Sequence, residues 1–152
     1  MNRLLILAAV AVLAGCGSSG SGGSGENTAD WPGPPKANAN GSVEFSDFND
    51  FLAGDGKEFA TSPITAVTEF LALDKTSAAV TTLRATSPGE VRNFSEVSAI
   101  LDGLLDDSVR GARYTVELQR NDANEWRIRA VDWAQRCQAG RGHQEFSPRP
   151  CV

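Results

Sequence analysis

The feature that most limits the possible folds is the hydrophobic period of the last third of the chain. Over residues 113–119, Tyr114, Val116 and Leu118 alternate with polar side chains, and after the polar stretch NDAN the alternation returns over 126–130. Such alternation is typical of β-strands with one buried face, and a polar turn between two of them predicts an antiparallel hairpin. A lone hairpin is marginal, so it needs another strand and a helix to cover it.

The second strand of this hairpin contains a change of phase. Val131 and Trp133 fall on the opposite face from Trp126 and Ile128 if the alternation continues without interruption. We therefore expect a β-bulge near this point, or a second covered surface.

Two segments upstream carry the signals of helix ends. In FSDFNDFLAG the apolar residues have helical spacing, Ser46 or Asp47 can act as the N-cap, and Gly54 can end the helix. In TSPITAVTEFLALD, Ser62 is a candidate N-cap and Pro63 fits the first helical turn. The face of this second helix is formed by Ile64, Val67, Phe70 and Leu71.

The segment between these helices and the hairpin is harder to interpret. Residues 76–86 leave two alternatives open, because their Thr and Val content favours a strand and the spacing of Val80 and Leu83 favours a helix. Residues 93–105 predict a helix, which opens with a capping-box-like pair, Asn93 and Glu96. Its apolar residues follow helical spacing: Val97, Ile100, Leu101, Leu104 and Leu105.

These patterns predict one α+β domain over residues 42–152. We expect a small antiparallel sheet containing the C-terminal hairpin, packed by two or three helices. Residues 76–86 would supply a further strand, and the leucine-rich helix would pack on the sheet. A disulfide-stapled tail would complete the domain.

The tail is the segment RCQAGRGHQEFSPRPCV, in which Cys137 and Cys151 bracket a basic loop. The loop has little apolar content beyond Phe146, so it cannot fold by burial alone. A disulfide closing a loop of about 15 residues would contribute about 3 kcal/mol in the chain-entropy view. A metal site would need more ligands than two cysteines and His143, so we expect a disulfide and no metal.

The amino terminus has the form of an export signal. A short positive start is followed by the apolar run LLILAAVAVLA, which is too short to span a bilayer. The sequence Leu13-Ala14-Gly15-Cys16 follows, and it resembles the lipobox of bacterial lipoproteins. The resemblance implies removal of the signal peptide 1–15, acylation of Cys16 with fatty acids such as palmitate, and a membrane anchor on the extracytoplasmic side. An ordinary secretory signal is the alternative.

Residues 16–41 join this leader to the predicted domain. They are rich in Gly, Ser and Pro and contain few hydrophobic residues, so we expect a disordered tether after the lipidated cysteine. Trp31 is its one large apolar residue, which could be incidental or could dock on the domain.

Charge is distributed unevenly along the mature chain. Residues 16–109 hold five basic and fourteen acidic residues, whereas residues 110–152 hold eight arginines and five acidic residues. The basic half could dock on the acidic half, or it could mark a surface for an anionic partner. The candidate contact residues are Arg113, Arg127, Arg129, Arg141 and His143.

Catalytic and cofactor motifs are absent from the sequence. It has no phosphate-binding glycine loop, zinc motif or calcium-loop spacing, and its single histidine lies on a small glycine loop. A hydrolase using His143 with Glu145 or Asp132 is a minor alternative. We expect no cofactor, no nucleic-acid partner and no enzymatic activity.

Two weaker resemblances concern the domain and its tail. SPITAVTEFLALD followed by YTVEL and EWRI is similar to lipid-anchored bacterial domains of the NTF2-like or cystatin-like kind, in which a helix lies across a curved sheet. The closing segment is similar to the tails of exported bacterial proteins. Our first hypothesis is a non-enzymatic binding or assembly module on the cell envelope. The alternative is a carrier of a small apolar ligand in an NTF2-like pocket.

Overall fold

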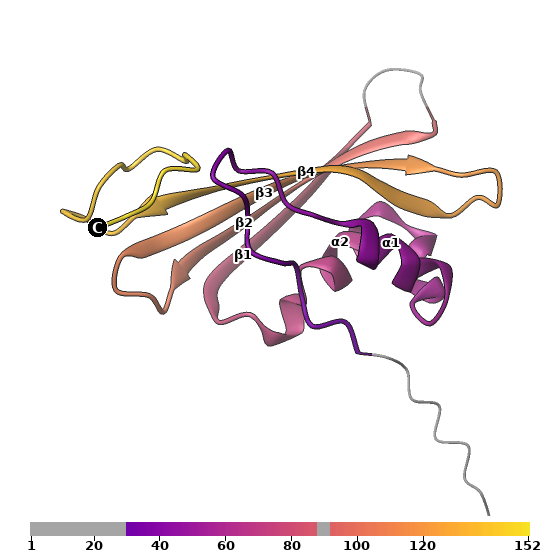
Figure 1. The fold of residues 1–152 in the computed structure, drawn as a ribbon, viewed down its shortest axis with the longest axis horizontal. Coiled ribbons are helices and arrows are strands. Elements are labelled where there is room, and N and C mark those ends of the chain that lie inside the picture. The colour runs from indigo at the N-terminus through magenta and orange to yellow at the C-terminus, as the bar shows by residue number, and fades with distance from the viewer. Residues whose placement is uncertain (1–29, 88–91) are drawn as a thin grey trace, which may run out of the picture.

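A twisted, four-stranded antiparallel sheet with helices on one face forms the framework of the protein (Figure 1). The computed structural model describes residues 30–87 and 92–152. The predicted signal peptide, Cys16 and the predicted tether up to residue 29 lie outside the described residues. The strands follow the order β1-β2-β3-β4. The elements are α1 (Ser46–Ala53), η1 (Lys57–Thr61), α2 (Pro63–Phe70), η2 (Leu73–Lys75), β1 (Ala78–Thr86), β2 (Phe94–Leu104), β3 (Val109–Arg120) and β4 (Trp126–Cys137).

The predicted hairpin is confirmed as β3 and β4. The bulge is also confirmed: Glu117 pairs with Ala130 but Leu118 pairs with Ile128, so Arg129 is an extra residue in β4. The extra residue brings Val131 onto the buried face that already holds Ile128.

Within the ambiguous segment 76–86, residues Ala78–Thr86 form strand β1, so the strand alternative is correct. β1 pairs with β2 along most of its length, from Ala78 opposite Leu104 to Thr86 opposite Glu96. The α+β architecture predicted from the sequence is therefore present, with two short α-helices, a four-stranded sheet and a C-terminal disulfide.

The helix predicted over residues 93–105 is wrong, because these residues form the central strand β2. The strand pairs with β1 on one side and β3 on the other. Its buried positions alternate: Ser95, Val97, Ala99 and Leu101 face the helices. Two of these four are small, which hid the period of two, while Leu105 is 90% exposed instead of belonging to an apolar face.

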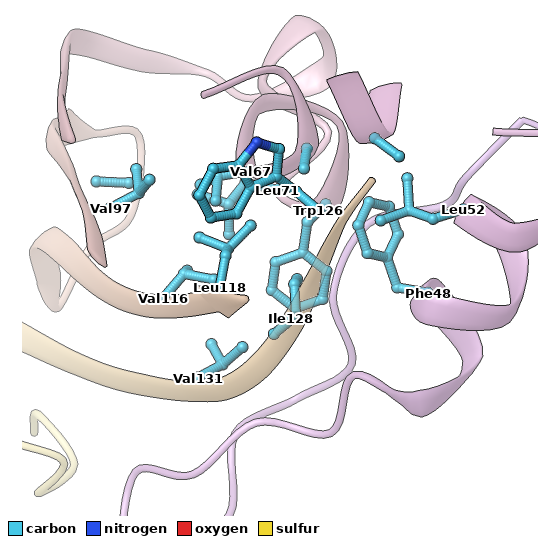
Figure 2. Packing of buried hydrophobic residues seen from close by; sticks show 14 of the residues in the cluster. Phe48, Leu52, Val67, Leu71, Val97, Val116, Leu118, Trp126, Ile128 and Val131 are labelled. Atoms are coloured by element: carbon cyan, nitrogen blue, oxygen red, sulfur yellow. The ribbon is translucent and has the colours of Figure 1, made fainter. Parts of the chain in front are cut away.

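Both predicted helices upstream are confirmed. α2 begins at Pro63, and the Ser62 hydroxyl accepts a hydrogen bond from the Thr65 N–H at 3.1 Å, as expected for an N-cap. α1 ends before Gly54 as expected, but the N-cap prediction is wrong: Phe45 takes that position instead of Ser46 or Asp47, and no side chain caps the helix. Figure 2 shows the apolar side chains of both helices converging on those of β3 and β4. The core residues it labels include Phe48, Leu52, Val67, Leu71, Leu118, Trp126, Ile128 and Val131.

The ordered domain begins earlier than residue 42, because the segment 30–41 packs against it. The Trp31 ring lies 4.9 Å from the Phe48 ring and 6.3 Å from the Phe70 ring, measured between centroids. Its indole N–H donates to the Phe70 carbonyl at 2.9 Å. Trp31 therefore docks on the domain, and the tether assignment needs correction over residues 30–41. The tryptophan buries its ring and satisfies its N–H at one point, which offsets the entropy of ordering a Gly/Pro-rich segment.

The C-terminal tail is closed by the expected Cys137–Cys151 disulfide, whose cysteines are 14 residues apart in sequence. Phe146 lies on the sheet face opposite the helices, where the guanidinium groups of Arg113 and Arg136 contact its ring at 5.1 and 5.2 Å. The bridge and this aromatic contact together fix the tail to β4.

We predict that Trp31→Ala lowers the free energy of unfolding by about 3 kcal/mol, because it removes a half-buried aromatic from a cluster of phenylalanines. Trp31→Phe should cost about 1 kcal/mol, since it keeps an aromatic ring and loses the indole hydrogen bond. Urea denaturation followed by circular dichroism measures both. Wild-type stability in the Ala variant would show that the segment does not belong to the domain.

Candidate functional site

The helix-bearing face of the sheet is only partly covered, and its open part forms a hollow. α1 and α2 pack over the half nearest the β3–β4 turn. The other half lies beneath residues 32–34 and the chain that follows α2, and these segments border an open hollow of about 480 Å³. Ligand sites in proteins are commonly concave and of this order of volume. We call this space the sheet hollow.

Strand register places the floor of the sheet hollow. Leu101 pairs with Ala112, and Ala112 pairs with Gln135, so these three side chains lie in one row across β2, β3 and β4. Tyr114 and Trp133 pair in a neighbouring row. The floor therefore carries two aromatic residues side by side, and further apolar walls come from Leu71, Leu104, Val109 and Pro34. Polar groups expose nearly as much of the lining as apolar groups do.

The sheet hollow also has polar side chains in its lining: Lys75, Thr76, Asp106, Tyr114 and Gln135. Burial raises the pKa of Tyr114, so its hydroxyl stays neutral and can donate a hydrogen bond. Within residues 30–87 and 92–152 this hydroxyl has no protein hydrogen-bond partner. The Gln135 amide is engaged, because its nitrogen donates to the Arg149 carbonyl at 2.8 Å. A floor of apolar and aromatic side chains with a free neutral hydroxyl suits a small molecule that has an apolar part and a hydrogen-bond acceptor.

Charged groups occupy the rim of the sheet hollow and are already paired. Lys75 forms an ion pair with Asp30 at 2.9 Å and donates to the Trp31 carbonyl at 3.0 Å. The Asp106 carboxylate accepts hydrogen bonds from the backbone N–H groups of Val109 and Ser108, which lower its pKa and keep it ionised. These groups hold the β2–β3 turn and the amino-terminal segment in place.

The arginines predicted to contact an anionic partner do not lie together in the structure. Arg113 stacks on Phe146 near one end of the sheet. Arg127 lies near the other end, where it forms an ion pair with Glu125 at 2.8 Å. Arg127 pairs with Gln119, six residues along β3 from Arg113, which corresponds to roughly 20 Å. Arg113 and Arg127 therefore cannot contact one small anion together.

The other candidate contact residues have separate surroundings. Arg129 is exposed at the bulge, and Arg141 donates from Nε to the Asp107 carbonyl at 3.3 Å. The His143 ring nitrogens lie 2.8 Å from the Glu145 carbonyl and 2.9 Å from the Arg149 carbonyl. The Glu145 carboxylate pairs with Arg149 and not with His143. The contacts of the His143 ring are therefore with the backbone of the tail, which they stabilise.

One cluster within the described ranges resembles a metal site. Ligand atoms of Cys137, His143 and Cys151 lie within 4.8 Å of one another. The two sulfur atoms are joined to each other, so they offer no thiolate to a metal while the disulfide is intact. Zinc and similar ions would have to compete with this covalent bond.

Sequence reasoning missed an ion pair that crosses the sheet. Asp102 on β2 binds Arg136 on β4, passing over β3 at Gly111. A Cβ atom at Gly111 would lie 3.3 Å from both Asp102 Oδ1 and Arg136 Nε, and 2.8 Å from the Leu101 carbonyl. Because Gly111 has no side chain, Asp102 and Arg136 can meet above β3. In the helix predicted over residues 93–105, Asp102 would lie off the apolar face, so that prediction gave no sign of this pairing.

The chain matches no protein-family model, no curated protein and no solved structure. Among the described residues, none of the helices has the length and apolar character needed to cross a bilayer.

We predict that Asp102→Asn lowers the free energy of unfolding by about 1 kcal/mol near neutral pH, because it removes the charge from a partly exposed ion pair. The hydrogen bond from Arg136 lowers the pKa of Asp102 below 3.8. The stabilisation is therefore present above pH 3.8 and is lost as the pH falls through the lowered pKa. The difference between wild type and variant should be constant at mildly acidic pH and should shrink below pH 3.8.

Asp132→Asn is the matched control for this measurement. Asp132 is exposed on β4 and forms no ion pair within the described ranges. Urea denaturation across the pH series should show little change for this variant. An equal loss in both variants would mean that the Asp102–Arg136 pair has no special contribution.

Proposed function

We propose that this protein is a membrane-anchored, non-enzymatic binding module of the bacterial cell envelope, and that the sheet hollow is its ligand site. The observation that supports this proposal most directly is the composition of the hollow. Leu101, Ala112 and Trp133 form an apolar surface, and the Tyr114 hydroxyl offers one hydrogen bond. The ligand class is a small molecule with an apolar part and an acceptor oxygen or nitrogen.

The same residues argue for binding without catalysis. Tyr114 is neutral, Asp106 is engaged by backbone N–H groups, and Gln135 is engaged by the tail. These groups can orient a ligand, but they include no nucleophile held against a base. An anionic partner on the arginine surface receives less support, because Arg113 and Arg127 are far apart and each already has a partner.

The membrane location in this proposal comes from the leader. The lipobox resemblance at Leu13–Cys16 would attach acyl chains to Cys16, and several chains on one residue hold a protein stably to a bilayer. Trp31, which docks at the start of the described chain, would then follow the anchor closely in sequence. The domain would sit on the extracytoplasmic side.

We predict that filling the sheet hollow abolishes ligand binding. Leu104→Trp places an indole in the hollow and should weaken binding of the uncharged apolar dye Nile red at least about tenfold, as measured by fluorescence titration. Native mass spectrometry of protein from its own host should show a bound small molecule in wild type and not in the variant.

Leu105→Trp provides a control of the same chemistry at the next residue. Leu105 is 90% exposed and does not line the hollow, so dye affinity should stay within about twofold of wild type. Equal dye binding by the Leu104 and Leu105 variants would remove the hollow as the ligand site. Circular dichroism confirms that both variants remain folded.

We also predict that Cys16→Ala releases the protein from the membrane fraction, because it removes the residue that would be acylated. Labelling cells with a palmitate analogue should mark wild type and not the variant. A wild-type protein that carries no label and retains Met1 in its mass spectrum would contradict the anchor while leaving the proposal for the sheet hollow open to its own test.

A further inference from the structure

The two edges of the sheet differ in how completely they are covered. β4 forms one edge and β1 forms the other (Figure 1). An uncovered edge strand carries unpaired N–H and C=O groups and is a template for pairing with another strand. The coverage of each edge therefore indicates where the protein can add a strand.

Chain segments from both ends of the domain cover the edge of β4. The Asn49 side chain exchanges two hydrogen bonds with the Ile128 backbone, at 2.8 and 2.9 Å. Further along, the Trp133 N–H donates to the Gly41 carbonyl at 2.7 Å. Gly41 has a φ of 93°, and a Cβ atom there would lie 2.6 Å from the Trp133 carbonyl, so glycine permits this close approach. The remaining edge bonds join Val43 to Val131, Ser147 to Gln135 and His143 to Cys137.

The edge of β1 has no such cover within residues 30–87 and 92–152. No described segment pairs with β1 other than β2. Seven of its nine residues are exposed. Its sequence, AAVTTLRAT, holds one charge and no proline, so it lacks most of the features that protect natural edge strands from pairing. Val80 is 58% exposed on this edge.

We propose that β1 is the contact surface between two copies of this protein, paired antiparallel about a twofold axis through Thr82. Thr82 is the middle residue of Ala78–Thr86, so an axis there pairs the whole strand. Residues at equal distances from the axis lie on the same face, as antiparallel pairing requires. The two four-stranded sheets then become one continuous sheet of eight strands.

This register is favourable for the side chains. It places Val80 of each copy opposite Arg84 of the other, so the methylene groups of the arginine cover the exposed valine. The two arginines lie four residues apart along the pair, or roughly 13 Å, so they do not repel strongly. A partner strand with a basic residue opposite Arg84 would be disfavoured by charge repulsion, whereas a second copy of β1 places Val80 there.

The small area of the β1–β1 contact indicates that two copies pair more readily on a membrane than in dilute solution. Two nine-residue strands joined at their edges bury less surface than the approximately 1,600 Å² of a standard stable interface. Association in dilute solution is therefore weak, and confinement of many copies to one membrane raises the local concentration. This step rests on the proposed anchor. The pairing itself does not, since it can be measured with purified protein at high concentration.

Cysteine cross-linking of the full chain tests the axis. Thr82→Cys should give a covalent dimer with a short bismaleimide, both in membranes and with concentrated purified protein, because the two copies of this residue face each other. Asp122→Cys, exposed in the β3–β4 turn, is the control and should stay monomeric. Absence of a dimer from Thr82→Cys in both preparations would overturn the proposal, and a product with the mass of another protein would show that a different partner occupies the edge.

A charge exchange tests the register. Val80→Lys, introduced with Thr82→Cys, places two lysines against two arginines and should reduce the cross-linked fraction about tenfold. Adding Arg84→Glu turns both contacts into opposite-charge pairs and should restore the dimer. Both sites are exposed, so circular dichroism should show an unchanged fold. A dimer that is insensitive to Val80→Lys, or is not restored by Arg84→Glu, would contradict this pairing.

Discussion

The single extra residue in β4 determines which side chains of the second half of this strand lie on each face of the sheet. Up to Ile128 the strand follows the alternation of the hairpin, and beyond Arg129 the phase is reversed. Because of this reversal, Val131 enters the core and Trp133 and Gln135 face the sheet hollow. Without the extra residue, Trp133 would lie on the face of the sheet opposite the helices. The binding surface that we propose therefore depends on the bulge, which also increases the twist of the strand.

Much of the architecture could be predicted, because several segments carry one dominant period. The hairpin alternates cleanly, and the Ser62–Pro63 pair marks the start of α2. The prediction failed at β2, where Ser95 and Ala99 occupy buried positions that a strand pattern would fill with larger apolar residues. With those positions small, the remaining leucine and isoleucine residues matched a helical period. Tertiary pairing on both sides of β2 overrode that local pattern.

The candidate site was less accessible to sequence reasoning than the fold. The sheet hollow exists because residues 32–34 cross above strands that come from the far end of the chain. No local pattern reports such a contact, although the isolated Trp31 was the available signal that the segment docks. The sequence shows that the carboxyl half is rich in arginine. It does not show that Arg113 contacts Phe146 or that Arg127 pairs with Glu125, because strand register decides these contacts. Composition gives the number of charged residues, whereas the contacts in the folded protein decide which of them can bind a partner.

The covering of β4 by both ends of the domain has a consequence for how the chain folds. Ser42 pairs with Asp132, 90 residues later, and Gln135 pairs with Ser147 just before the terminus. The Ser42–Asp132 contact forms late and slowly, since a large loop must close before it is made. Because synthesis begins at the amino end, residues 41–43 remain unpaired until β4 has been made. Proteolytic removal of either end would expose a strand rich in aromatic and aliphatic residues, and the shortened domain would then aggregate.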